Sequence, residues 1–267
     1  MFSVYSPVLH ELSQLVLDTF NAEKNSVKAS QKDKHDYVTN VDNVLQSKII
    51  RFLNSKFPEH DAYGEEAMPK ELELAKPTWV IDPLDGTSNF LFDVPFYGCS
   101  LALIVEGGVK VAFVMDFINQ EVFTAFRGEG AFLNGVRLNS IESQSDYIGV
   151  SSGYLQHLAL HNPGYLLTLR QNGKFRILGS QALHLCYVAS GRFKACINYE
   201  AKIWDDIAGA LIIEESGGYY CSEVGFSTRN ISLKRIEQNL QSAAFISKEL
   251  IESGEFKTKG NSVFKVQ

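Results

Sequence analysis

Two aspartates three positions apart, Asp82 and Asp85, follow a short apolar run in the segment WVIDPLDGTSNF, residues 79–90. The run predicts a buried strand that stops where Pro83 fixes the turn. A turn of this kind can bring both carboxylates and the Leu84 carbonyl oxygen to one point, and these are the hard oxygen ligands that Mg²⁺ prefers. Asp-Pro and Asp-Gly are also common turn dipeptides. The strand before the motif and the Gly-Thr-Ser after it favour a metal site over an ordinary turn.

The next three residues, Gly86, Thr87 and Ser88, open a predicted helix. Gly86 lets the backbone turn tightly, and the first amides of a helix have no partner within it. Such amides bind anionic groups such as phosphate. We therefore expect a phosphate-binding turn beside the carboxylates.

Two further acidic segments occur elsewhere in the chain. Glu65 lies in a Gly-Glu-Glu turn after a short β-prone run, and Asp205 lies in a Trp-Asp-Asp segment that opens a predicted helix. Taken alone, the first is an ordinary solvated acidic turn and the second an ordinary helix N-cap. Neither segment identifies a site by itself.

Helices and strands alternate around these segments. Apolar residues at helical spacing predict helices over residues 7–24 and 40–57. The polar stretch between them, NSVKASQKDKHD, predicts an exposed loop or hairpin. A β meander is expected over residues 98–134, with a Gly-Gly turn. In the second half, the predicted strands lie near 146–151, 174–178, 193–198 and 242–246, and the predicted helices near 154–171, 180–190, 205–216 and 247–253.

The mixture of helices and strands defines the expected fold class. Strands mixed with helices throughout predict layered sheets and helices, α+β or α/β. No linker, repeat or low-complexity tract divides the chain. We expect one compact unit of two halves, residues 1–140 and 141–267, that share an interface.

The composition limits the partners. The chain has 267 residues, 45% apolar and 21% charged, as in an ordinary globular protein. Its net charge is −6 and it has no basic run, which argues against nucleic acid as the principal partner. The four cysteines form no CxxC pair, so buried thiols in a reducing compartment are expected. Without a signal peptide or an apolar run of membrane-spanning length, we expect a cytoplasmic protein with no membrane contact.

Four segments in this order resemble the signatures of the inositol monophosphatase family, Mg²⁺-dependent phosphatases of the lithium-sensitive superfamily. They are VTNVD at 38–42, GEE at 64–66, WVIDPLDGTSNF at 79–90 and WDDIAGALIIEESGG at 204–218. The resemblance implies a layered αβαβα sandwich of the α+β class, usually seen as a homodimer. It also implies that the first half carries most metal ligands and the second half carries Asp205 and the substrate contacts.

The resemblance assigns roles to the matching positions. Asp42 and Thr87 are similar to the pair that orients the attacking water, and Glu65 is counted with them as catalytic. The amides of Gly86, Thr87 and Ser88 would hold phosphate. Two or three Mg²⁺ ions would be held by Glu65, Asp82, Asp85, Asp205 and the carbonyl of Leu84. The rest of the substrate would contact Gly179, Ser180, Gln181 and Glu200. One lysine of the family's metal-binding loop corresponds to Lys28, Lys32 or Lys34.

The chain departs from the family at two places. The stretch between Glu200 and Trp204 is slightly shorter than in the animal enzymes, which leaves the specificity for inositol open. Ile207 stands where the family usually has a small residue, a change that we expect to affect only packing.

The implied reaction is Mg²⁺-dependent hydrolysis of a small phosphate monoester by water that the metals activate. Inositol 1-phosphate or a similar sugar or polyol monophosphate is the first candidate substrate. Adenosine 3′,5′-bisphosphate and histidinol phosphate are alternatives within the enzyme class. A catalytically silent regulatory binding protein is the alternative from another class. The sequence contains no P-loop or HExxH motif that would indicate different chemistry.

Overall fold

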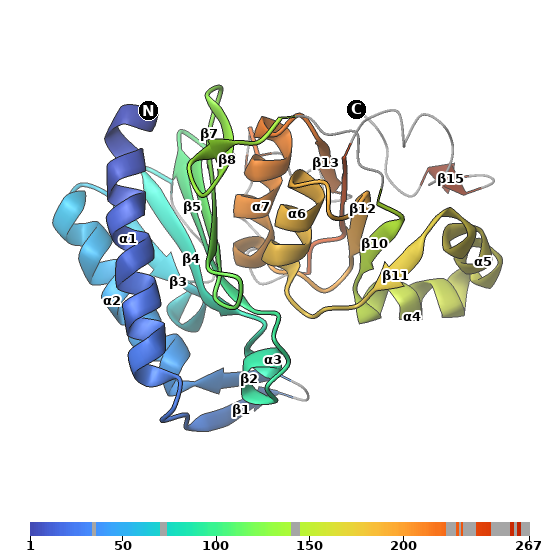
Figure 1. Ribbon diagram of the computed structural model, residues 1–267, viewed down its shortest axis with the longest axis horizontal. Helices are drawn as coiled ribbons and strands as arrows, with labels where there is room; N and C mark the ends of the chain where they lie inside the picture. The colour runs from blue at the N-terminus through green and yellow to red at the C-terminus, as the bar shows by residue number, and fades with distance from the viewer. Residues whose placement is uncertain are drawn as a thin grey trace.

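Five layers make up the computed structural model of the protein, in the order helices, sheet, helices, sheet, helices (Figure 1). This order confirms the αβαβα sandwich of the α+β class. The structure describes residues 1–33, 36–69, 74–139, 145–222, 228–229, 231, 239–246, 257–258 and 261–262. The helix predicted near 247–253 and the predicted boundary near residue 140 lie outside these residues.

Helices α1 (Phe2–Glu23) and α2 (Asn40–Lys56) form the first outer layer. Their apolar stripes pack on one face of the first sheet in a cluster that includes Leu12, Val16 and Ile49. The first helix begins at Phe2 rather than near residue 7. The Phe2 ring packs against the sheet, with its centroid 5.0 Å from that of Phe126, which holds the extra turn in place.

The first sheet has the strand order β3-β4-β5-β6-β7-β8-β9, antiparallel except for the parallel pair of β3 and β4. Both faces are covered by helices, so its central strands are apolar at nearly every position. In β5, for example, Leu101 and Leu103 face α1 and α2, while Ala102 and Ile104 face the middle helices. The strands are β3 (Asp61–Gly64), β4 (Thr78–Asp85), β5 (Gly98–Val105), β6 (Gly108–Asp116), β7 (Glu121–Phe126), β8 (Gly130–Leu133) and β9 (Val136–Arg137).

The middle layer consists of α6 (Gln181–Ala189) and α7 (Ile203–Glu215). Both are apolar almost all round, as expected of helices enclosed between two sheets. The second sheet has the order β11-β10-β12-β14-β13, and β13 was not predicted from the sequence. Its strands are β10 (Tyr147–Val150), β11 (Lys174–Arg176), β12 (Ala195–Asn198), β13 (Tyr219–Ser222) and β14 (Ser242–Phe245).

The last layer corrects one prediction. The single helix expected over 154–171 is two helices, α4 (Ser152–His161) and α5 (Pro163–Asn172). The break falls at Asn162, because the residue before a proline is disfavoured in the helical conformation. The Asn162 side chain then accepts a hydrogen bond from the Tyr165 amide and begins the second helix.

Three shorter elements border the first sheet. The predicted polar hairpin is formed by β1 (Ala29–Asp33) and β2 (Asp36–Thr39), and it lies beside α3 (Thr87–Leu91) (Figure 1). A single 3₁₀ turn, Glu65–Ala67, follows β3. Within the described residues no helix combines the length and apolar character needed to cross a membrane. All four cysteines lie in that part of the chain as free thiols: Cys99, Cys186 and Cys196 are buried, and Cys221 is partly exposed.

Candidate active site

The aspartate pair lies in a turn at the end of β4. Every residue of β4 is buried, and its pairing with β5 is interrupted between Asp82 and Asp85. The Leu84 amide donates to Asp82 Oδ1 at 2.9 Å and so fixes this carboxylate in the turn. Gly86 follows at φ 92°, and a Cβ there would lie 3.1 Å from the Phe96 carbonyl oxygen. A side chain at this position is therefore strained, and glycine is favoured.

Asp42 and Thr87 meet although they are far apart in the sequence. Thr39 begins α2 with a capping box, and its amide and hydroxyl donate to Asp42 Oδ2 at 2.8 and 2.5 Å. The other oxygen, Asp42 Oδ1, lies 2.9 Å from Thr87 Oγ1, which is also 2.9 Å from the Leu84 carbonyl oxygen. Burial raises the pKa of Asp42, and the hydrogen bonds from Thr39 and Thr87 oppose that rise.

Three carboxylates from three distant segments form a cluster. Glu65, Asp82 and Asp205 each offer an oxygen within 4.8 Å of the other two. Glu65 comes from the turn after β3, and Asp205 is the third residue of α7 rather than its N-cap. The Asp205 carboxylate accepts the Lys202 amide at 2.7 Å. Burial, together with the neighbouring carboxylates, raises the pKa of Asp82 and of Asp205 well above the usual value.

Asp85 borders this cluster and links it to α6. Its Oδ2 accepts the Ser180 hydroxyl at 2.6 Å and the Ala182 amide at 2.7 Å. Burial raises the pKa of Asp85 to about 7, although both hydrogen bonds lower it. The neighbouring carboxylates also repel one another, and this repulsion is relieved when a cation binds between them.

Lys32 stands beside the cluster and provides a positive charge from the hairpin. Its Nζ lies 3.1 Å from Glu65 Oε1 and 2.6 Å from Glu66 Oε1. Burial alone would lower its pKa, but the two glutamates raise it above the usual value. Of the two described lysines among the three considered from the sequence, Lys32 is the one at the cluster. Lys28 is exposed at the base of the hairpin, and Lys34 lies outside the described residues.

A sequence model described as the inositol monophosphatase family matches residues 3–225. The chain belongs to this family. It is 36% identical over 209 residues to the "Nus factor SuhB" of Pasteurella multocida, covering 74% of this chain and 76% of that relative.

Solved structures of the family agree with this assignment. SuhB from Bartonella henselae, described as an extragenic suppressor protein, superposes with a TM-score of 0.73 at 29% identity, covering 94% of this chain and 96% of that one. An IMPase of Thermotoga maritima superposes with a TM-score of 0.76 at 27% identity, covering 96% and 95%. The family and the acidic cluster together suggest divalent metal binding.

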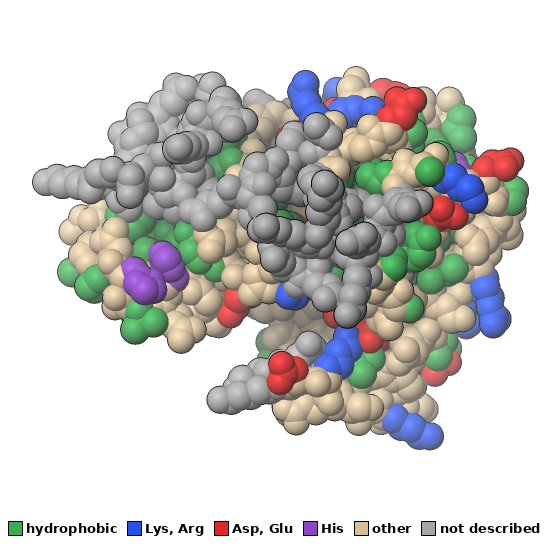
Figure 2. All heavy atoms as spheres, turned by 180° about the vertical axis from the view of Figure 1, so that it is seen from behind, with side chains coloured by type: hydrophobic (Ala, Val, Ile, Leu, Met, Phe, Trp, Pro, Cys, Tyr) green, Lys and Arg blue, Asp and Glu red, His purple; other side chains and the backbone are tan. Residues whose placement is uncertain are grey.

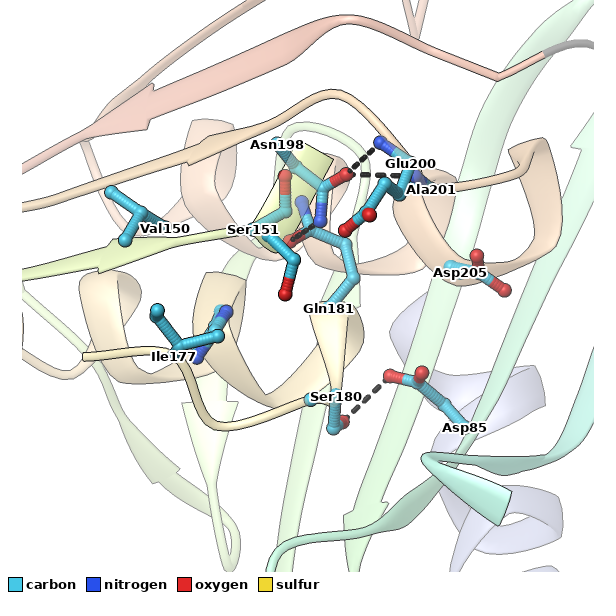
Figure 3. A pocket seen from close by; sticks show the side chains of 13 residues that line it. Asp85, Val150, Ser151, Ile177, Ser180, Gln181, Asn198, Glu200, Ala201 and Asp205 are labelled. Atoms are coloured by element: carbon cyan, nitrogen blue, oxygen red, sulfur yellow. Dashed lines mark hydrogen bonds between the residues drawn. The ribbon is translucent and has the colours of Figure 1, made fainter. Parts of the chain in front are cut away.

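A pocket of about 160 Å³ opens beside Asp85 and Asp205, between the start of α6 and the loop that leads into α7 (Figure 3). Four of the predicted substrate-binding residues line it: Gly179, Ser180, Gln181 and Glu200. Gly86, Thr87 and Ser88 lie at the start of α3 rather than among the lining residues. Asn89 of α3 ties the two regions together, because its Nδ2 donates to the Leu178 carbonyl at 2.5 Å and to the Phe96 carbonyl at 2.7 Å.

Gln181 has its side chain committed to other protein groups. Its Nε2 donates to Asp206 Oδ1 at 2.7 Å, and its Oε1 accepts from Asn198 Nδ2 at 2.9 Å. No role was predicted from the sequence for Asn89, Asn198 or Asp206. The sequence did contain a signal for Asp206. It is a charged residue at the start of a largely apolar helix, and a charged side chain that is buried in such a helix needs a partner.

Proposed function

We propose that this protein hydrolyses a small phosphate monoester with bound Mg²⁺, and that a sugar or polyol monophosphate such as inositol 1-phosphate is the preferred substrate. The observation that carries the proposal is the cluster of Glu65, Asp82 and Asp205, whose oxygens approach within 4.8 Å. Three carboxylates this close repel one another, and oxygen ligands of this type suit Mg²⁺. Two or three bound ions would neutralise phosphate oxygens and lower the pKa of water. Asp85 and the Leu84 carbonyl are proposed as the remaining ligands.

Asp42 and Thr87 are proposed to orient the attacking water. A threonine hydroxyl has one hydrogen and can accept further hydrogen bonds. When Thr87 donates its hydrogen to Asp42, its oxygen is available to accept a hydrogen bond from water. The hydrogen bonds from Thr39 keep the Asp42 carboxylate turned toward Thr87. The amides of Gly86, Thr87 and Ser88 are proposed to hold the phosphate.

The pocket supports a polyol as the alcohol part of the substrate. Its polar lining includes the hydroxyls of Ser151, Ser152 and Ser180 and the carboxylate of Glu200, groups that bind hydroxyls. Its lining residues include no lysine, arginine, phenylalanine, tyrosine or tryptophan within the described chain. His184 is the one basic type, and burial lowers its pKa to about 4, so that it is neutral. An adenine nucleotide would favour aromatic and basic groups, which makes adenosine 3′,5′-bisphosphate the second choice.

Phosphate release tests the proposal. The substrates are inositol 1-phosphate, adenosine 3′,5′-bisphosphate, fructose 1,6-bisphosphate and histidinol phosphate, each measured with Mg²⁺ and with EDTA. We expect inositol 1-phosphate to lead, EDTA to abolish turnover, and Asp205→Asn to lower it by orders of magnitude without unfolding the protein. No release from any substrate, by a folded protein that binds Mg²⁺, would reject hydrolysis of these esters and favour a regulatory binding protein.

The names of the relatives support a second candidate, a role as a Nus factor that does not require catalysis. On the face shown in Figure 2, the described acidic and basic side chains are interspersed rather than gathered in one basic patch. The net charge of −6 keeps nucleic acid from being our first choice of partner. The Asp205→Asn variant separates the two candidates, because it should lose turnover and keep a role that depends only on the fold.

We also propose that the protein is a cytoplasmic homodimer whose two halves, 1–140 and 141–267, form one compact unit. Composition and family resemblance support this proposal. Light scattering coupled to size-exclusion chromatography gives the mass in solution. A monomer at micromolar concentration would reject the dimer.

A further inference from the structure

A hydrogen-bond network of buried polar side chains begins at Asp206, next to the proposed metal ligand Asp205. Asp206 has no exposed surface and does not line the pocket. Its Oδ1 accepts from Gln181 Nε2 at 2.7 Å and from Ser242 Oγ at 3.2 Å, and its Oδ2 accepts the Tyr220 hydroxyl. The carboxylate is therefore surrounded by donors from α6, β13 and β14.

The hydrogen-bond network continues from Gln181 to the loop that carries Glu200. Gln181 Oε1 accepts from Asn198 Nδ2 at 2.9 Å. Asn198 Oδ1 in turn accepts the backbone amides of Glu200 at 2.6 Å and Ala201 at 2.7 Å (Figure 3). The three side chains that form this network are all buried: Asp206, Gln181 and Asn198.

The donors and acceptors of this hydrogen-bond network can be arranged in only one way. Backbone amides only donate, so Asn198 must turn its oxygen toward Glu200 and Ala201 and its NH₂ group toward Gln181. Gln181 must then turn its oxygen toward Asn198 and its NH₂ group toward Asp206. A carboxylate only accepts, so Asp206 fixes the amide of Gln181 in this orientation. A buried amide turned the other way would leave donors facing donors and polar groups without partners, which is unfavourable in the protein interior.

The loop is held from its other side as well. Ser151 Oγ accepts the Tyr199 amide at 3.0 Å. The Glu200 side chain lies over Gly153, where a Cβ would come within 2.7 Å of Glu200 Cγ. Glu200 thus rests in a place that the surrounding residues define, on the pocket wall together with Asp85 and Asp205.

We propose that Asp206 is a positioning residue for substrate specificity: through Gln181 and Asn198 it fixes loop 199–201, and with it the Glu200 carboxylate that recognises a hydroxyl of the substrate alcohol. The inference rests on the proposed phosphatase function. It differs from a structural role, because it predicts that a change at Asp206 affects substrates with and without hydroxyls differently.

The kinetic test compares inositol 1-phosphate with 4-nitrophenyl phosphate, whose alcohol part has no further hydroxyl. We expect Asp206→Leu to lower the ratio of kcat/KM for inositol 1-phosphate to kcat/KM for 4-nitrophenyl phosphate by about tenfold or more. This change corresponds to the loss of one hydrogen bond between a substrate hydroxyl and the charged Glu200 carboxylate. Asp206→Asn should change the ratio by no more than about threefold, because the asparagine oxygen can still accept from Gln181. In a Glu200→Ala background, Asp206→Leu should leave the ratio unchanged, since the group it positions is gone.

Asp116→Leu is the matched control. Asp116 is also a buried carboxylate, and it accepts the amides of Ile118 and Asn119 in a turn of the first sheet. Its loss should lower thermal stability and leave the substrate ratio unchanged. An equal change of the ratio in Asp116→Leu and Asp206→Leu would overturn the inference, and so would an effect of Asp206→Leu that persists without Glu200.

Amide hydrogen exchange provides a readout that does not need turnover. In Asp206→Leu the amides of Glu200 and Ala201 should exchange faster, while those of Ile118 and Asn119 should not change. If Asp206→Leu does not fold, Gln181→Met interrupts the same hydrogen-bond network and should produce the same pattern of exchange. Unchanged exchange at residues 200 and 201 would overturn the inference. If the wild-type protein releases no phosphate while exchange behaves as expected, the proposed function fails and the positioning of the loop stands.

Discussion

The Thr87 hydroxyl is the group whose geometry most constrains the proposed chemistry. It lies 2.9 Å from both Asp42 Oδ1 and the Leu84 carbonyl oxygen, so it joins the proposed water-orienting carboxylate to a proposed metal ligand. Removing only this oxygen should leave the turn intact, because the amide of residue 84 and not Thr87 fixes the Asp82 carboxylate.

We expect Thr87→Val to lower kcat for the preferred phosphate ester by about 10²-fold, the usual contribution of a group that transfers or orients a proton. Thr87→Ser keeps the hydroxyl and should restore most of the rate. Initial rates in saturating Mg²⁺ measure both, and thermal unfolding verifies that both variants fold. A Thr87→Val enzyme within threefold of wild type would contradict the assigned role.

Asp82 illustrates the conflict between stability and metal binding at a single residue. Only 2% of it is exposed, and its pKa is raised by burial and by the charges of Glu65, Asp205 and Asp85. Without metal, this carboxylate opposes folding at neutral pH, because a group that is hard to ionise in the folded state ionises readily in the unfolded chain.

Asp82→Asn should therefore raise the Tm in EDTA by a few degrees and abolish the further rise that Mg²⁺ produces in the wild type. Calorimetry with EDTA and with Mg²⁺ measures both effects. Asp61→Asn, which changes a partly exposed carboxylate paired at 3.6 Å with Lys76, is the control and should leave the Mg²⁺ effect unchanged. A lower Tm for Asp82→Asn in EDTA would mean that hydrogen bonding, rather than repulsion, dominates at this position.

At the scale of elements, the packing of α6 on α7 depends on a missing side chain. Gly209 lies in the interior of α7, and a Cβ there would come within 2.5 Å of Leu185 Cδ1 and 2.6 Å of Leu185 Cβ. Helix propensity favours alanine over glycine by about 1 kcal/mol. The steric conflict outweighs this gain, because Leu185 Cβ belongs to the rigid part of α6.

We expect Gly209→Ala to destabilise the protein by about 1–3 kcal/mol, the usual cost of overpacking a core. Gly164→Ala in α5 is the matched control, since a Cβ there meets nothing within 4 Å. That variant should be neutral or up to about 1 kcal/mol more stable. Chemical denaturation of both variants measures the difference. Equal stabilities would show that α6 can move away from α7 without cost.

Elements with a strong local pattern were predictable, and contacts between distant elements were not. The strand and turn around Asp82 follow from a β-prone run stopped by Asp-Pro, and the position of α2 follows from its apolar spacing. The break at Asn162 was also readable, because Pro163 follows directly, but the apolar period across it was mistaken for one helix. Which lysine reaches Glu65 depends on the hairpin register, and no sequence pattern shows that Gln181 turns toward Asp206.

At the scale of the whole molecule, the cluster joins the two halves of the chain. Glu65 and Asp82 belong to residues 1–140 and Asp205 to residues 141–267, and one apolar core runs from the first sheet through α6 and α7 to the second sheet. Charge repulsion in the cluster therefore acts across the middle of the molecule, and its effect on stability should be global.

In the metal-free protein, the raised pKa values of these carboxyl groups make stability depend on pH. The pKa of Asp85 is raised by burial from 3.8 to about 7 in the folded state, and those of Asp82 and Asp205 are also raised well above their usual value, by burial and by neighbouring carboxylates. The folded protein thus holds more protons than the unfolded chain between these pH values. Its free energy of unfolding must fall as the pH rises through about 7, because ionisation is easier in the unfolded chain.

Mg²⁺ should reverse this dependence, since metal binds the ionised carboxylates and its affinity rises with pH. We expect the Tm in EDTA to fall between about pH 5 and about pH 8, and the gain in Tm from saturating Mg²⁺ to grow over the same range. Asp85→Asn removes one of the titrating groups and should flatten the EDTA curve. Curves that stay parallel with and without Mg²⁺ would show that the ion does not bind these ionised carboxylates. A Tm in EDTA that does not fall over this range would show that their pKa values are not raised in the folded protein.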